Sequence, residues 1–216
     1  INLREKEFHN KLQSKKHGRF ENIFYKAIFN ISEDFFDYLK DISNNCEILD
    51  YGCGVGAFVE KIAKYNPKKI TGIDISEVSI DKAIDNTKSL DIDVTFKVDN
   101  CEKTSFNSNS FDIVYGTGIL HHLKIKNCLD EIFRILRPNG NLVFIEPLGT
   151  NPLINIYRKL TPKSRSKDEH PLVKKDFEYI NSKFKNINIK YYGLTTLIFF
   201  PFYRSPQNSK IFKLLT

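Results

Sequence analysis

The chain has 216 residues, of which 41% are hydrophobic and 27% are charged, and its formal net charge is +7. This length is enough for one α/β domain with a sizeable core and is marginal for two domains. No stretch approaches the ~20 consecutive apolar residues of a membrane span. The lysines are spread along the chain among acidic residues, which favours a solvated surface and argues against a nucleic-acid partner.

The four cysteines, Cys46, Cys53, Cys101 and Cys128, form no CxxC pair and have no histidine at zinc-ligand spacing. We therefore expect reduced thiols and no metal site. No secretory signal is visible, so the sequence predicts a cytoplasmic protein.

Apolar residues in the first part of the chain recur at helical spacing, from Phe20 to Ile31 and from Phe35 to Leu39. Residues 1–45 are therefore predicted to form an N-terminal helical cap. Beyond this point, short hydrophobic runs alternate with helical patterns. Strands are predicted at 47–51, 69–74, 94–98, 111–115 and 141–146. Helices are predicted at 57–65, 77–90 with Ser76 as N-cap, 128–136 and 177–184.

Two further strands, 187–192 and 195–200, are predicted as an antiparallel pair joined at Gly193. The alternation predicts a doubly wound, Rossmann-like α/β fold. Its sheet would be seven-stranded and mostly parallel, with a C-terminal antiparallel strand and helices on both faces. This domain would span 46–216 and include a lid-like insertion at about 147–175.

A glycine-rich turn, with Gly52, Gly54 and Gly56, follows the first predicted strand and opens a helix. Glycines allow a sharp turn and let a ligand approach the backbone, while a helix N-terminus offers unpaired N–H groups. Gly52, Gly54 and Ala57 also match the G-x-G-x-x-[GA] pattern of dinucleotide-binding turns. The turn alone leaves NAD and S-adenosylmethionine equally open.

Three acids at the ends of the first three predicted strands discriminate between these ligands. Asp50 directly precedes the glycines, where a carboxylate would crowd a pyrophosphate but suits the amino group of a methionine moiety. Asp74 ends the second strand and can accept both ribose hydroxyls of either ligand. Asp99 follows the third strand and can accept the amine of adenine, which favours the methyl donor.

These segments together resemble the class I S-adenosylmethionine-dependent methyltransferases, and specifically their small-molecule branch. The matching segments, in family order and spacing between about Cys46 and Glu146, are Ile48 to Gly56, Ile73 to Ser76, Val98 to Asn100, Ser110 to Tyr115, Leu120 to Leu123 and Leu136 to Gly140. The resemblance implies S-adenosyl-L-methionine as cofactor. It also implies cofactor contacts at Asp50, Gly52, Cys53, Gly54, Asp74, Ile75, Asp99, Asn100, Tyr115, Gly116 and Thr117.

Methyl transfer needs orientation above all, and an oxygen nucleophile usually also needs a base. Three candidate bases lie at the end of the fifth predicted strand or after the fourth or fifth: Glu146 ends the fifth strand, while His121 and His170 follow the fourth and the fifth. Residues 152–171 carry an apolar helix face followed by basic residues. They are expected to form a lid over the acceptor or a plain surface helix. Arg19, Phe24 and Tyr25 could form the other half of a lid or simply pack on the sheet.

The resulting hypothesis is transfer of a methyl group to an oxygen or nitrogen atom of a small-molecule acceptor. The alternatives left open are an RNA or protein methyltransferase, an NAD(P)-binding oxidoreductase, and a relative that binds the cofactor without turnover. The oxidoreductase requires pyrophosphate at the glycine turn, which Asp50 opposes.

Overall fold

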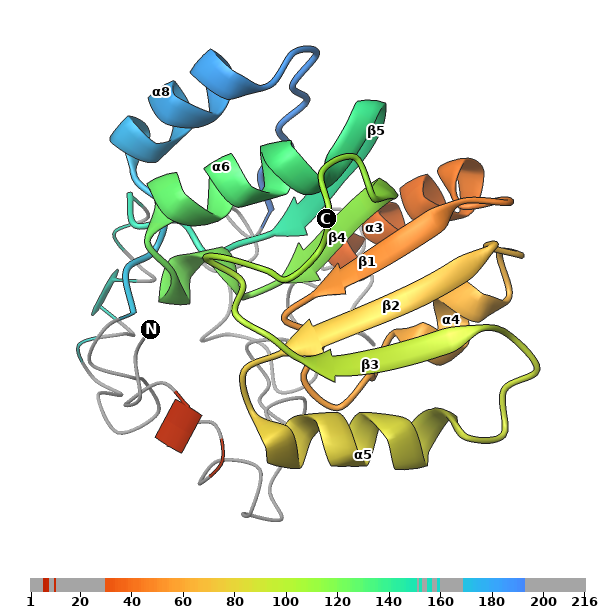
Figure 1. Cartoon of the computed structure of the whole chain (residues 1–216). Coiled ribbons are helices and arrows are strands. Elements are labelled where there is room, and N and C mark those ends of the chain that lie inside the picture. The colour runs from red at the N-terminus through yellow and green to blue at the C-terminus, as the bar shows by residue number, and fades with distance from the viewer. Residues whose placement is uncertain are drawn as a thin grey trace, which may run out of the picture.

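The computed structural model describes residues 6, 7, 10, 30–150, 152, 155, 156, 159 and 169–192. In this part of the chain, five parallel strands form one sheet with helices on both of its faces (Figure 1). The strands are β1 (Glu47–Tyr51), β2 (Lys69–Asp74), β3 (Val94–Val98), β4 (Phe111–Thr117) and β5 (Leu136–Ile145). The helices are α3 (Asn30–Ile42), α4 (Val59–Ala63), α5 (Glu77–Thr87), α6 (Ile125–Ile135) and α8 (Lys174–Lys183).

The strand order is β3-β2-β1-β4-β5. The chain adds β2 and β3 on one side of β1, and then returns to add β4 and β5 on the other side of β1. Ligands of open α/β sheets bind in the crevice at the carboxyl ends of the strands, where the order reverses. Here the order reverses between β1 and β4. The two strands pair in parallel, with Asp50 opposite Tyr115.

Two hydrophobic clusters cover the two faces of the sheet. On one face, α6 and α8 pack over a cluster that includes Tyr51 and Val114. On the other face, α3 covers a cluster that includes Ile48 and Tyr115. Both faces of β1 and β4 are therefore buried, as a parallel sheet requires. This rigid centre fixes the positions of the loops at the carboxyl edge.

Local sequence signals account for several element boundaries. The predicted N-cap is confirmed, because the Ser76 hydroxyl accepts a hydrogen bond from the Ser79 N–H, 3.1 Å away. The predicted turn at 138–140 lies inside β5. Leu136 of β5 pairs with Phe111 of β4, whereas the next pair is Asn141 with Ile113, so the register between the two strands shifts at this point. That local bulge accommodates Asn139, whose φ of 64° is left-handed.

The prediction of a strand at 187–192 is wrong, because these residues are irregular in the structure. Their alternating pattern leaves Ile189 and Tyr191 exposed, and no neighbouring strand of the described sheet pairs with them. The predicted strand at 195–200 lies outside the described residues, as do Arg19, Phe24 and Tyr25. The described sheet therefore has five parallel strands in place of the expected seven with an antiparallel partner. None of the described helices is long and apolar enough to cross a membrane.

Candidate functional site

The glycine turn after β1 adopts a backbone conformation that requires its glycines. Gly52, Gly54 and Gly56 have φ values of 78°, 52° and 70°, all in the left-handed region. A Cβ atom added to Gly52 would lie 2.6 Å from the Ile119 side chain, whereas one added to Gly54 would meet no protein atom within 4 Å. The turn is therefore tightly packed at Gly52 and open at Gly54. Gly54 is where a ligand could approach the backbone.

Asp74 holds the glycine turn against the end of β2. Its Oδ2 accepts the Gly54 N–H at 3.0 Å, and its Oδ1 accepts the Ser76 N–H at 2.8 Å. The Gly52 and Cys53 N–H groups both donate to the Ile73 carbonyl, at 2.9 and 2.8 Å. Each carboxylate oxygen of Asp74 keeps a further lone pair, so the group can still accept hydroxyl donors.

Asp50 is a buried carboxyl group beside this turn, with 4% of its surface exposed. Burial raises the pKa of its carboxyl to about 7, the nearby Tyr115 hydroxyl opposes the rise, and the charge of Asp74 adds to it. The Tyr115 hydroxyl is itself buried and makes no hydrogen bond of good geometry. No lysine or arginine among the described residues forms an ion pair with Asp50. A cationic ligand group would supply the missing counter-charge.

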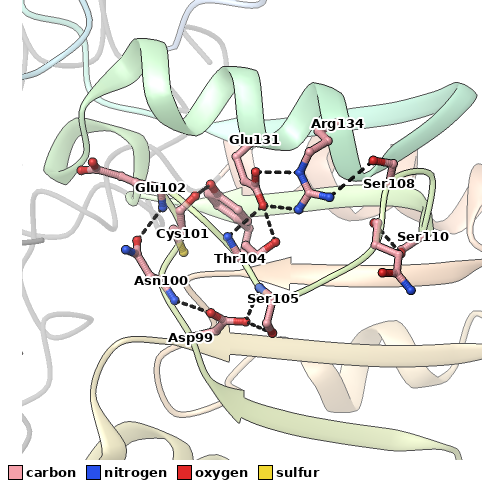
Figure 2. Close-up of polar contacts among 12 residues, drawn as sticks. Asp99, Asn100, Cys101, Glu102, Thr104, Ser105, Ser108, Ser110, Glu131 and Arg134 are labelled. Carbon is pink, nitrogen blue, oxygen red and sulfur yellow. Dashed lines mark hydrogen bonds and ion pairs between the residues drawn. The ribbon is translucent and has the colours of Figure 1, made fainter.

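Asp99 and Asn100 lie in the loop after β3, where Figure 2 shows them linked to Ser105 and Glu102. Asp99 accepts the Asn100 N–H at 2.8 Å and both the N–H and hydroxyl of Ser105 at 3.0 and 2.7 Å. Burial raises the pKa of the Asp99 carboxyl, but these hydrogen bonds together lower it below its usual value. Asp99 is therefore an ionised acceptor that also fixes the shape of its loop.

The other predicted cofactor contacts differ in their accessibility. Cys53 is buried and Ile75 is half-buried at the turn after β2. Tyr115 is fully buried and packs edge-on against Phe35 of α3, at 6.0 Å between ring centroids. Gly116 is closely packed, since an added Cβ would lie 2.6 Å from the Phe144 ring, and Thr117 ends β4 half-buried. The Tyr115 ring thus belongs to the core.

The structure brings two of the predicted catalytic residues into direct contact. The His121 Nδ1 lies 2.7 Å from Glu146 Oε2, with both side chains at least nine-tenths buried. His121 lies on a short 3-10 helix, η2 (Leu120–His122), which follows β4. Glu146 Oε1 caps this helix by accepting the N–H groups of Ile119 and Leu120 at 2.8 and 2.7 Å. Glu146 therefore orients His121 and stabilises the helix on which it lies.

The third candidate, His170, is exposed, and its backbone N–H donates to the His121 carbonyl at 2.8 Å. Its neighbour Glu169 is the residue that sequence reasoning missed. Glu169 Oε1 lies 3.7 Å from His121 Nε2, and its side chain is 6% exposed. The only signal for Glu169 in the sequence is its place in the acidic pair that directly precedes His170.

The fold and the site define an α/β protein whose parallel sheet carries a glycine turn and three acidic residues, Asp50, Asp74 and Asp99, at its carboxyl edge. A family model described as a methyltransferase domain matches residues 42–194. The chain belongs to this family, the class I S-adenosylmethionine-dependent methyltransferases.

Similar proteins include sterol 24-C-methyltransferase erg-4 of Neurospora crassa, 33% identical over 59% of this chain and 34% of the relative. Phosphoethanolamine N-methyltransferase 3 of Arabidopsis thaliana is 27% identical over 70% of this chain and 33% of the relative. The chain thus spans about a third of the length of these curated relatives. The YcgJ protein of Bacillus subtilis has the same fold, with a TM-score of 0.59, 18% identity and coverage of 69% and 67% of the two chains.

Proposed function

We propose that the protein transfers a methyl group from S-adenosylmethionine to an oxygen or nitrogen atom of a small-molecule acceptor. The observation that carries this proposal is the open, left-handed Gly54 beside the buried carboxyl group of Asp50. An open backbone position fits a bound cofactor, and a buried acid without a basic partner among the described residues fits the cofactor's amino group.

Different residues at the carboxyl edge fit different moieties of the cofactor. Asp50 and the Gly52 to Gly54 backbone would hold the methionine moiety, Asp74 the ribose hydroxyls, and Asp99 the adenine amine. The bound cofactor supplies an activated methyl group, so the chain has mainly to orient the acceptor and exclude water. We propose His121 as the base, with Glu146 holding its ring and His170 contributing through its backbone.

The relatives support a small-molecule acceptor, because they are named for sterol and phosphoethanolamine substrates. An NAD-dependent activity is less well supported, since the charge of Asp50 would face a pyrophosphate. All four cysteines are free. Free thiols support the further proposal of a reducing, cytoplasmic setting.

Thermal unfolding in the presence of S-adenosylhomocysteine and of NAD tests the cofactor assignment. Ligand at 100 times its dissociation constant should stabilise the folded protein by about 2.7 kcal/mol. We expect this shift with S-adenosylhomocysteine and none with NAD. A shift with NAD alone would overturn the proposed function.

A further inference from the structure

The neighbouring strands β1 and β4 direct Asp50 and Tyr115 to the same layer of the protein. The two residues lie opposite each other in the parallel register, as Ile48 and Ile113 do two residues earlier. Side chains two residues apart on a strand share a face of the sheet. Because Ile48, Ile113 and Tyr115 all belong to the cluster beneath α3, Asp50 also points into this apolar layer, beside Tyr115.

Both side chains are withdrawn from solvent. Asp50 is 4% exposed and Tyr115 is 0% exposed, and Phe35 of α3 packs edge-on against the Tyr115 ring. The Tyr115 hydroxyl completes no hydrogen bond of good geometry with any of the described residues. A phenylalanine would fill the same space without the free energy that burying an unpaired hydroxyl costs. The hydroxyl is therefore expected to act on a group beside it.

The group on which this hydroxyl acts is the Asp50 carboxyl. Burial raises the pKa of Asp50 to about 7, and the Tyr115 hydroxyl lowers it as a hydrogen-bond donor. Burial also raises the pKa of the Tyr115 hydroxyl, and the charge and hydrogen bonding of Asp50 raise it further. Opposite effects of this kind are expected when a phenol donates to a carboxylate. The two groups are thus close enough to interact, although their alignment falls short of a well-formed hydrogen bond.

The other titratable groups that interact with Asp50 do not favour its ionised form. The charge of Asp74, at the end of β2, raises the pKa of Asp50. The thiols of Cys53 and Cys101 also lie within electrostatic range, but burial raises the pKa of both thiols, so they stay uncharged near neutral pH. Within the described part of the chain, Tyr115 is therefore the side chain that favours an ionised Asp50.

We propose that Tyr115 is a positioning residue of the methyl-donor site: its hydroxyl donates to one oxygen of the ionised Asp50 carboxylate and leaves the other oxygen to accept from the amino group of the cofactor. The inference rests on the proposed function. A cationic amino group binds best to an ionised carboxylate, and burial opposes that ionisation, so a donor beside Asp50 favours the form that binds. The Tyr115 ring stays in the core, and the residue acts on the cofactor through Asp50.

Cofactor binding should then be linked to the loss of a proton from Asp50. Below its pKa of about 7, Asp50 is mostly protonated, whereas the bound amino group requires the ionised form. The affinity for the cofactor should therefore fall about tenfold for each pH unit below this pKa. Without the Tyr115 hydroxyl the pKa of Asp50 would be higher, so the same loss of affinity would begin at a higher pH.

Calorimetric titration of the wild type and of Tyr115→Phe with S-adenosylhomocysteine tests this linkage. At about pH 6 the variant should bind about tenfold more weakly, because a hydrogen bond to a charged group shifts a pKa by about one unit or more. By about pH 9 Asp50 is ionised in both proteins, and the two affinities should converge. Titration of the ligand itself is common to both proteins and cancels in their ratio. A purely structural role of the hydroxyl would give the same ratio at both pH values.

Urea unfolding without ligand gives a second measurement that does not depend on the cofactor. The fall in stability that accompanies the ionisation of Asp50 should extend about one pH unit higher in Tyr115→Phe than in the wild type. Tyr179→Phe is the matched control, because it removes a tyrosine hydroxyl that donates to another carboxylate, Asp130, at 2.6 Å. This control should show neither pH-dependent change.

An affinity ratio that is the same at both pH values, or equal affinities at the lower one, would overturn the positioning role of Tyr115. An unchanged upper limit of the stability slope in Tyr115→Phe would do so as well. If the wild type binds no S-adenosylhomocysteine at any pH, the proposed function fails and this inference fails with it, whatever the unfolding curves show.

Discussion

The two edges of the sheet use acidic residues in different ways. At the amino edge, Arg137 lies 2.7 Å from both Asp112 and Glu47, and Lys68 lies 2.7 Å from Glu47. At the carboxyl edge, Asp74 and Glu146 are held mainly by backbone N–H groups. Basic side chains neutralise the first set, while backbone dipoles orient the second set and leave its charge available.

This difference indicates which acids serve the fold and which serve a ligand. The side chains of the amino-edge pairs are between 24% and 61% exposed and tie strand ends together, so each pair contributes little to stability. The buried Asp50 has no such basic partner among the described residues, and its burial opposes ionisation. An arrangement of this kind costs folding free energy and is expected where a ligand supplies the missing charge.

Substitution of the turn glycines should have the largest effect on stability and on cofactor binding. It should also separate the packing role of Gly52 from the ligand-binding role proposed for Gly54. Gly52→Ala adds a left-handed alanine and a clash with Ile119, and should lower the free energy of unfolding by about 3 kcal/mol. Gly54→Ala lacks the clash and should cost only about 1–2 kcal/mol. It should nevertheless weaken S-adenosylhomocysteine binding more than tenfold. Urea unfolding and calorimetric titration measure the two effects, and unchanged binding in Gly54→Ala would remove Gly54 from the site.

The pH dependence of stability should report the unpaired charge at Asp50. Its folded-state pKa of about 7 lies above the ordinary value of 3.8, so between these pH values the folded state binds more protons than the unfolded state. The contribution of Asp50 to stability therefore falls as pH rises from about 4 to 7, by a few kcal/mol at most. Asp50→Asn should remove this part of the slope. Parallel slopes for the ligand-free wild type and variant, from urea unfolding across this range, would contradict the assignment.

Glu146 should prove important to the η2 segment and its histidine. Glu146→Gln keeps the size of the side chain but replaces one acceptor oxygen with an NH2 group that faces N–H donors. We expect a loss of about 1–3 kcal/mol in the free energy of unfolding. The NMR signals of the His121 ring nitrogens should also shift in this variant, because its contact with Nδ1 changes. Glu178→Gln, at an exposed position, should change neither property.

The smallest effect is expected at the amino edge. Arg137→Met removes both contacts to Asp112 and Glu47 but should lower the free energy of unfolding by only about 1 kcal/mol, and less at high salt. The affinity for S-adenosylhomocysteine should not change. A large loss of affinity in this variant would contradict the division of the two edges.

The sequence predicted the five strands and the glycine turn because these depend on local patterns. Hydrophobic runs and left-handed glycines are determined within a few residues of each position. The boundaries of β5 were less predictable, since the bulge around Asn139 depends on pairing with β4. The run at 187–192 had the alternation of a strand, but strand formation needs a pairing partner that a single segment does not reveal.

The site shows the same division between local and long-range information. Asp50, Asp74 and Asp99 were predicted from their places at strand ends, yet the Ser105 contacts of Asp99 were not. The Glu169 contact with His121 joins residues 48 positions apart (169 − 121) across the insertion. Nothing in either local segment indicates this pairing, because it depends on how residues 169–172 return to the sheet.

Calorimetric titration of the wild type with S-adenosylhomocysteine, repeated with NAD, tests most directly whether the carboxyl edge is a methyl-donor site. We predict one molecule of S-adenosylhomocysteine bound per chain, no heat from NAD, and an affinity at least tenfold lower in Asp50→Asn. Binding of NAD in preference to S-adenosylhomocysteine, or an affinity unaffected by Asp50→Asn, would contradict that assignment.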